Sequence, residues 1–324
     1  MSVFLFAPNL LRSLGCLAPL LVLLACGPRS DQRRDGSDSA GSQVGAAASG
    51  DSSDAIAAAL VDDAGDSLPP PARRTRIVSL IPATTEILFA LGAGDRVVGR
   101  TRWDSWPPAA AAVPDLGDGI RPSVETIISA RPDLVILYAT GDNRAAALSL
   151  RAAGIPVISL RMDLIEQFER ATLVLGAAVG EPARARGVVD SVRATLDRVR
   201  AATAGQARPT VFMMAWEVPL MTIGSGSFLS ELVEIAGGRN VFGDMDGPSP
   251  QVSFEEVLRR NPQFILGRPE TVGKLTGSDR WRGLPAVRDG RVLVMDTLIV
   301  GRPGVRLGEA AVSIAKLLHP GLVP

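Results

Sequence analysis

The sequence predicts an α/β protein made of two similar lobes, each a parallel sheet flanked by helices, joined by one long rigid helix. Three observations predict this fold class. A helix-to-strand segment at residues 123–137 occurs again at residues 253–267. Short apolar runs alternate with helical segments along the chain, which is typical of parallel sheets covered by helices. A single long helical segment, residues 183–204, separates the two copies of the repeat.

Each copy of the repeat is interpreted as a capped helix followed by a buried strand. Ser123 and Ser253 are predicted N-caps, because a serine hydroxyl accepts a hydrogen bond from a backbone N–H that has no partner inside the helix. Pro132 and Pro262 end the helices, and the run of four apolar residues that follows each proline predicts a strand buried on both faces.

The N-terminal lobe is predicted to cover residues 74–181. It begins with an apolar run at 76–81 that favours a buried first strand. Thr84 or Thr85 is expected to cap the helix that follows. The remaining predicted elements are strands at 97–99, 134–138 and 154–159 and helices at 144–153 and 166–179.

Residues 182–205 are predicted to form the connecting helix. Val188, Val192, Leu196 and Val199 make an apolar stripe at helical spacing, which indicates that one face of this helix is buried.

The C-terminal lobe is predicted to cover residues 206–324. Its first strand is expected at 210–215, its last at 291–295 and its final helix at 307–318. Residues 85–92 and 97–99 are weakly similar to residues 230–237 and 241–243, and the two pairs occur in the same order, which supports duplication of the lobe.

The first 73 residues are predicted to lie outside the folded lobes. Residues 1–26 are typical of a secretory signal and end in Leu-Ala-Cys, which resembles a bacterial lipoprotein signal in which Cys26 becomes the lipidated N-terminus. An ordinary signal peptide with an incidental cysteine is the alternative. Residues 27–73 are rich in Gly, Ser, Asp and Ala and are predicted to be a disordered tether.

The composition argues against several classes of function. Lys and Arg together number 34, as do Asp and Glu, so no net charge favours nucleic acid as a partner. The single histidine, His319, speaks against a Ser–His hydrolase or a histidine-rich metal site. The chain also lacks a phosphate-binding Gly-x-x-x-x-Gly-Lys-Ser/Thr loop. A lipid-anchored α/β enzyme and a ligand-free scaffold stay open as alternatives to a binding protein.

Aromatic residues are scarce, so the places where they gather are informative. Large rings and one arginine are expected at the carboxyl ends of predicted strands or in the loops that follow, where open parallel sheets bind ligands. Trp281 lies away from that edge and is predicted to pack locally. The candidate ligand-binding residues are Trp103, Trp106, Tyr138, Trp216 and Arg302.

Four stretches carry a resemblance to a known family: residues 76–87, 98–108, 132–136 and 250–255. They resemble the substrate-binding proteins of ABC importers for cobalamin, ferric siderophores and haem, and are most similar to the cobalamin binders. The resemblance covers residues 76 to about 318. It implies two lobes joined by a rigid helix, with the ligand in a cleft between the lobes.

The resemblance also implies roles for individual residues. Trp103 and Tyr138 match ligand-stacking rings, Trp216 lies next to a ligand-contacting phenylalanine, and Arg302 lies in the region that closes the site. Ser249, and Leu116 or Gly117, stand where the cobalamin binders have rings. Glu125 and Glu255 match the two glutamates that dock on arginines of the permease.

The function implied by the resemblance is binding without chemistry. We expect a lipid-anchored, monomeric protein of the cell envelope that needs no cofactor, carries cobalamin or a related corrinoid as its transported ligand, and delivers it to an ABC permease and ATPase complex. A ferric siderophore or haem is the alternative ligand.

Overall fold

The computed structural model describes residues 61–322. The predicted signal peptide, Cys26 and the tether before residue 61 lie outside the described residues. Within residues 61–322, no helix is both long enough and apolar enough to cross a membrane.

The N-terminal lobe is built on a four-stranded parallel sheet with the order β2-β1-β3-β4. Its strands are β1 (Ile77–Ser79), β2 (Val97–Gly99), β3 (Leu134–Tyr138) and β4 (Val157–Leu160). Its helices are α2 (Pro82–Ala90), α3 (Val124–Ser129), α4 (Gly141–Ala152) and α5 (Ile165–Val179), with short 3-10 turns η1 (Gly94–Arg96) and η2 (Pro108–Ala112).

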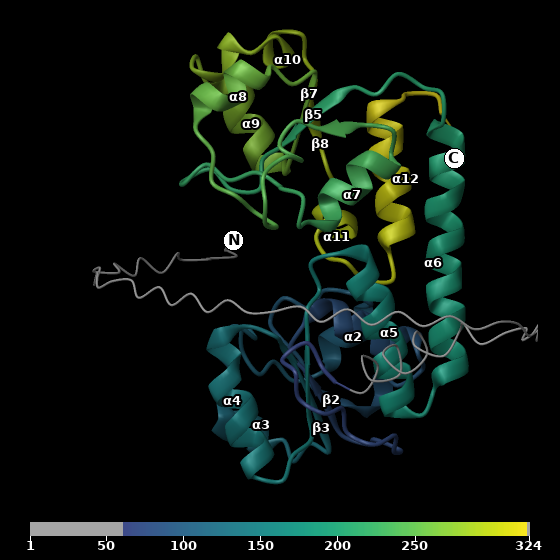
Figure 1. Cartoon of the computed structure of the whole chain (residues 1–324). Coiled ribbons are helices and arrows are strands. Elements are labelled where there is room, and N and C mark those ends of the chain that lie inside the picture. The colour runs from purple at the N-terminus through teal and green to yellow at the C-terminus, as the bar shows by residue number, and fades with distance from the viewer. Residues whose placement is uncertain (1–60, 323–324) are drawn as a thin grey trace, which may run out of the picture. The chain divides into compact units, whose positions relative to one another are not determined.

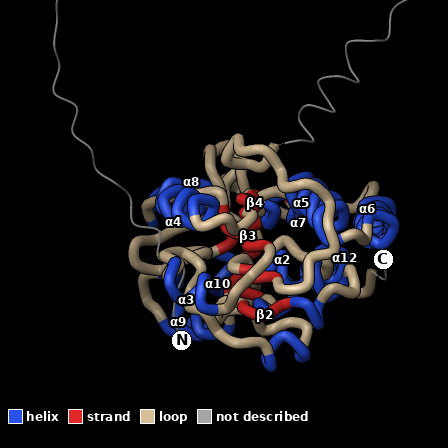
Figure 2. The backbone as a smooth tube through the Cα atoms, turned by 90° about the horizontal axis from the view of Figure 1, so that it is seen from below, coloured by secondary structure: helices blue, strands red, loops and turns tan. Residues whose placement is uncertain are grey.

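Helices cover both faces of this sheet, because successive strand residues point to opposite sides. In β3, Leu134 and Ile136 join the apolar cluster that includes residues of α2 and α5. Val135 and Leu137 join the cluster that includes residues of α3 and α4. Figure 2 shows the strands with α3 and α4 on one side and α2 and α5 on the other. Two-sided burial explains why these strands are continuously apolar.

The C-terminal lobe repeats the same plan. Its parallel sheet has the order β6-β5-β7-β8, which is the N-terminal order shifted by four strands. Its strands are β5 (Thr210–Met213), β6 (Arg239–Asn240), β7 (Phe264–Gly267) and β8 (Val292–Val294). Its helices are α7 (Phe228–Ile235), α8 (Phe254–Arg260), α9 (Pro269–Gly277), α10 (Pro285–Arg288), α11 (Thr297–Val300) and α12 (Leu307–Leu318), with a 3-10 turn η3 (Trp281–Gly283). The predicted duplication is confirmed.

The sequence repeat has the predicted local structure. The Ser123 hydroxyl accepts a hydrogen bond from the Thr126 backbone N–H at 3.2 Å, and the Ser253 hydroxyl accepts one from Glu256 at 3.0 Å. Both serines are therefore N-caps, of α3 and α8. In each lobe the strand that follows, β3 or β7, lies next to the first strand of its sheet.

The connecting helix α6 (Pro182–Thr203) is displaced by one residue from the long helical segment predicted at 183–204, and it lies within the connecting region predicted at 182–205. It contacts α5 of the N-terminal lobe and α7 and α12 of the C-terminal lobe, and Figure 1 shows it alongside α12. Its buried stripe includes Val192, Leu196 and Val199, which belong to one apolar cluster with residues of both lobes. At 1.5 Å per residue, its 22 residues span about 33 Å. Its continuous packing supports the expectation of a stiff connection.

The prediction of a tether up to residue 73 is wrong for its last part. Asp62 is buried and accepts hydrogen bonds from Arg151 at 2.9 Å and from the Ser159 backbone at 2.9 Å. Asp63 pairs with Arg170 at 2.6 Å. A stretch rich in Gly, Ser and Asp has the composition of a tether, but arginines of α4 and α5 give these carboxylates partners on the lobe.

Two local predictions also differ from the structure. The helix α2 begins at Pro82, and Ile81, not a threonine, is its N-cap. Proline suits the first helical position because its fixed φ is already helical. The Thr84 and Thr85 hydroxyls instead bond the Ser79 hydroxyl, at 2.7 and 2.9 Å.

Candidate functional site

The predicted ligand-binding residues lie beyond the carboxyl ends of the strands in both lobes. Trp103 and Trp106 belong to the loop that follows β2, which we call the aromatic loop (residues 100–107). Tyr138 is the last residue of β3, and Trp216 follows β5. Arg302 lies in the loop between α11 and α12, which we call the crossing loop (residues 301–306).

A buried aspartate fixes the aromatic loop. Asp104 is 4% exposed, and its carboxylate accepts hydrogen bonds from the Thr101 backbone at 2.9 Å and from the Thr101 hydroxyl. The backbone N–H of Trp103 donates to the same hydroxyl at 3.2 Å. Burial raises the pKa of Asp104, and the Thr101 hydrogen bonds oppose that effect. The backbone that carries Trp103 is therefore held in place by Thr101 and Asp104.

Tyr138 is half-buried and bonded at its hydroxyl. That hydroxyl donates to the carboxylate of Asp163, which follows β4. Burial and the neighbouring carboxylate raise the pKa of Tyr138 well above its ordinary value, so the phenol stays neutral. The ring is thus oriented by a partner on the adjacent strand end.

Trp216 is held by its own loop in the C-terminal lobe. Its indole N–H donates to the Val218 carbonyl at 2.9 Å, and its backbone pairs with Met221 in an antiparallel bridge. The guanidinium of Arg268, at the N-cap of α9, lies 5.4 Å from the centre of the ring. Arg268 is exposed and forms no ion pair with any residue in the range 61–322. Arg268 was not among the ligand-binding residues predicted from the sequence.

The crossing loop brings Arg302 and Trp106 to the same contact between the lobes. The Arg302 guanidinium lies 3.4 Å from the Glu86 carboxylate and donates to the Ser105 hydroxyl at 3.1 Å. Arg306 lies 4.5 Å from the centre of the Trp106 ring. Two of the five predicted ligand residues therefore take part in lobe-to-lobe contacts.

Glu86, at this contact, was not among the site residues predicted from the sequence. Its side chain is 1% exposed, and its Oε2 atom has no hydrogen-bond partner within the described part of the chain. Burial raises its pKa to about 7, with Arg302 and Arg306 opposing the rise and Asp104 adding to it. The available signal was the echo of Thr85-Glu86 in Ser230-Glu231.

The two predicted docking glutamates occupy equivalent exposed positions. Glu125 lies in the first turn of α3 and Glu255 in the first turn of α8. Glu255 is 3.6 Å from Arg280, and both side chains are largely in solvent. Each glutamate has an exposed aliphatic residue three positions on, Ile128 at 40% and Leu258 at 38%. The two lobes thus present the same carboxylate and aliphatic pair.

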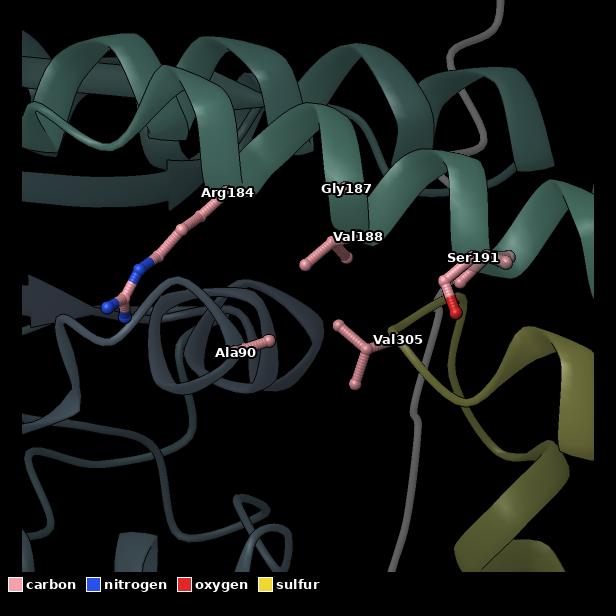
Figure 3. A pocket seen from close by; sticks show the side chains of 7 residues that line it. Ala90, Arg184, Gly187, Val188, Ser191 and Val305 are labelled. Atoms are coloured by element: carbon pink, nitrogen blue, oxygen red, sulfur yellow. The ribbon is translucent and has the colours of Figure 1, made fainter.

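A pocket of about 340 Å³ lies elsewhere, between α2, α6 and the crossing loop. Figure 3 shows Ala90, Val188 and Val305 around it, with Arg184 at one side. None of the predicted ligand residues lines this pocket. In the part of the chain that the structure covers, no group of three or more His, Cys, Asp or Glu residues could hold a metal ion.

The expectation that Trp281 packs locally is borne out. Trp281 packs in the C-terminal core, stacked on Phe212 at 6.1 Å and edge-on to Phe254 at 4.9 Å. His319 is the C-cap of α12.

The chain is similar to known proteins in sequence and in fold. A sequence profile described as periplasmic binding protein matches residues 77–297. A vitamin B12-binding protein of Vibrio cholerae is 27% identical over 244 residues, which cover 75% of this chain and 88% of that protein. The crystal structure of the periplasmic vitamin B12-binding protein BtuF of Vibrio cholerae has a TM-score of 0.67 and covers 76% of this chain and 97% of its own.

Two other relatives carry different descriptions. The uncharacterized ABC transporter substrate-binding lipoprotein YvrC of Bacillus subtilis is 28% identical over 253 residues, which cover 76% of this chain and 80% of that protein. The periplasmic haem-binding protein RhuT of Roseiflexus sp. RS-1 is 27% identical with a TM-score of 0.69, over 75% of this chain and 97% of its own.

Proposed function

Because the chain belongs to the periplasmic binding protein family, we propose that it captures cobalamin or a related corrinoid between its two lobes and delivers it to an ABC permease. The family members that match it are binding proteins for transport, so this chain is a binding protein and not an enzyme.

The observation that carries the corrinoid proposal is the placement of rings at the strand ends of both lobes. Trp103 and Tyr138 come from one lobe and Trp216 from the other, and each is tied to its own loop or neighbour by a hydrogen bond. A flat macrocycle between such rings would gain about 0.5–1.5 kcal/mol per aromatic contact beyond the apolar area that it buries. The similarity to vitamin B12-binding proteins supports the same ligand.

Haem or a ferric siderophore of the same group is the second candidate, in particular one that carries carboxylates. The exposed Arg268 guanidinium beside Trp216 favours it, since arginine binds carboxylates through paired hydrogen bonds. The similarity to RhuT supports it as well. Ser249 and Gly117, which stand where cobalamin binders have rings, leave room for a ligand that needs fewer aromatic contacts.

Docking on the permease is proposed to use Glu125 and Glu255. Their equivalent positions on α3 and α8 offer two carboxylates to two cationic groups of a partner. Ile128 and Leu258 would add apolar contact beside each carboxylate. Cys26 is proposed as the lipidated residue that anchors the protein at the cell envelope, and the description of the relative YvrC as a lipoprotein supports this.

A ligand panel followed by tryptophan fluorescence tests the proposal. Three of the four tryptophans lie at the proposed site, and Trp281 lies in the core. We expect saturable quenching by cyanocobalamin at sub-micromolar concentration and no quenching by a metal-free linear peptide of similar mass. Quenching by haem or a ferric siderophore alone would move the ligand to the second candidate. A flat response to all three would reject a binding function at these rings.

A further inference from the structure

The duplicated lobes place a glutamate at matching points of two equivalent helices. Glu86 lies in α2 and Glu231 in α7, the helices that follow the first strand of each sheet. Each is preceded by a hydroxyl residue, Thr85 or Ser230. Each of the two glutamates contacts the opposite lobe.

Glu231 reaches from the C-terminal lobe to the start of α5. Its Oε2 atom accepts a hydrogen bond from the Ile165 backbone at 2.8 Å. Ile165 is the first residue of α5, where backbone N–H groups lack partners inside the helix and the helix dipole favours an anion. Beside this contact, the Phe228 backbone donates to the Asp163 carbonyl at 2.6 Å. The carboxylate therefore helps complete a helix end of the other lobe.

Glu86 makes the reciprocal contact from the N-terminal lobe. Its Oε1 atom lies 3.4 Å from the Arg302 guanidinium in the crossing loop. Its Oε2 atom faces the backbone of the same loop at Gly304, where an added Cβ would come within 2.3 Å of that oxygen. No side chain fits at residue 304 unless the carboxylate or the loop moves, so the two lobes are in close steric contact here.

The Glu86 contact, the Glu231 contact and helix α6 connect the two lobes at three separate places. Helix α6 packs on α5 on one side and on α7 and α12 on the other. The two glutamate contacts add to the restraint that helix α6 already places on rotation and separation of the lobes. The crossing loop also holds the proposed ligand residue Arg302, and Arg306 beside it covers the ring of Trp106.

We propose that Glu86 and Glu231 are a reciprocal pair of positioning residues that fix the spacing of the two lobes, and so hold Arg302 and Trp106 in the arrangement that captures the ligand. The part that concerns capture rests on the proposed function, whereas the part that concerns lobe spacing does not.

A distance measurement that needs no ligand tests the lobe spacing. Spin labels are placed at S149C on α4 and T276C on α9, both exposed, in the full chain with Cys16→Ser and Cys26→Ser. We expect one narrow interlobe distance distribution, which Glu86→Ala and Glu231→Ala each broaden or shift. Glu86→Gln keeps the size of the side chain and is expected to restore most of the original distribution. Glu270→Ala, an exposed first-turn glutamate of α9, is the matched control.

A further variant keeps the proposal testable if Glu86→Ala or Glu231→Ala fails to fold. Gly304→Ala removes no charge and acts only by contact with the Glu86 carboxylate, so we expect it to shift the same distribution. Identical distributions in the parent chain, in both alanine variants and in Gly304→Ala would overturn the proposal.

The consequence for capture is measured separately by titration with cyanocobalamin. Glu86→Ala and Glu231→Ala are each expected to weaken binding by roughly five- to tenfold, at the lower end of measured coupling between sites. Unchanged affinity in Glu231→Ala, together with an altered distance distribution, would reject the link between spacing and capture. If cyanocobalamin fails to bind the parent chain, the proposed ligand is wrong, and the distance measurement still decides the role of the two glutamates.

Discussion

The Glu86 carboxylate and the Arg302 guanidinium come from opposite lobes and lie 3.4 Å apart, although 216 positions separate them in the sequence. The glutamate is almost completely buried, and the arginine is 17% exposed. Burial, not the arginine, dominates the titration of the pair, since the pKa of Glu86 is raised from 4.5 to about 7. The strength of this contact between the lobes is therefore expected to depend on pH.

Stability is expected to fall with rising pH because of Glu86. The folded chain holds the Glu86 proton more tightly than the unfolded chain does, so the contribution of this group is fully present below about pH 4.5 and is lost as the pH rises through about 7. Glu86→Gln should remove that loss. Between about pH 5 and about pH 8 we expect the parent chain to lose up to about 3 kcal/mol of unfolding free energy relative to Glu86→Gln. Urea unfolding of both chains at each pH measures it, and a constant difference would contradict it.

Arg268 is expected to distinguish the two candidate ligands. Arg268→Ala removes an exposed guanidinium beside Trp216 without taking away the ring. Binding of a carboxylate-bearing ligand such as haem should weaken about tenfold, which corresponds to about 1.4 kcal/mol, while binding of cyanocobalamin should change little. Equilibrium titration of each ligand gives the comparison. The control is Arg288→Ala, which removes an exposed arginine of α10 in the same lobe and should alter the affinity for neither ligand.

Removal of the docking glutamates should separate transport from binding. Glu125→Ala with Glu255→Ala is expected to abolish ligand uptake by cells that depend on this protein, because it removes both carboxylates of the proposed docking contact. Both side chains are exposed, so their loss should leave the fold unchanged. Affinity for the ligand should stay within twofold of the parent chain. The matched control, Glu270→Ala, loses a first-turn glutamate on α9 and should transport normally. Loss of affinity in the double variant would reject the docking assignment.

Arg151 is expected to contribute to the stability of the N-terminal lobe. Its guanidinium bonds Asp62 and Asp66, and the Asp62 side chain is fully buried. Arg151→Ala would leave that buried carboxylate with fewer partners and should cost about 1–3 kcal/mol of unfolding free energy. Urea unfolding against Arg288→Ala measures the effect. An unchanged midpoint in Arg151→Ala would show that the bonds of Arg151 to Asp62 and Asp66 add nothing to the stability of the lobe.

The parts of the fold that depend on local signals could be predicted from the sequence. Ser123 and Ser253 cap their helices through residues three positions away, and the buried strands that follow are continuous apolar runs. Helix α6 was predicted to within one residue because its apolar stripe repeats at helical spacing.

The parts that depend on distant partners could not be predicted. Asp62 has the sequence surroundings of a tether, and only the fold brings Arg151 to it. In the sequence Glu86 looks like an ordinary exposed acid of a helix, because only the fold brings the crossing loop over it. The rings of the candidate site were found because aromatic residues are scarce in this chain, whereas Arg268 is one of many arginines and gave no such signal.

Calorimetric titration of the purified chain with cyanocobalamin tests the central claim most directly. A corrinoid-binding protein of this kind should bind one ligand per chain with a dissociation constant well below about 1 μM, or about −8 kcal/mol. The Trp103→Ala and Trp216→Ala variants should each weaken that binding, because the rings come from opposite lobes. Absence of heat at saturating cyanocobalamin, from a chain whose circular dichroism shows it to be folded, would contradict corrinoid capture between the lobes.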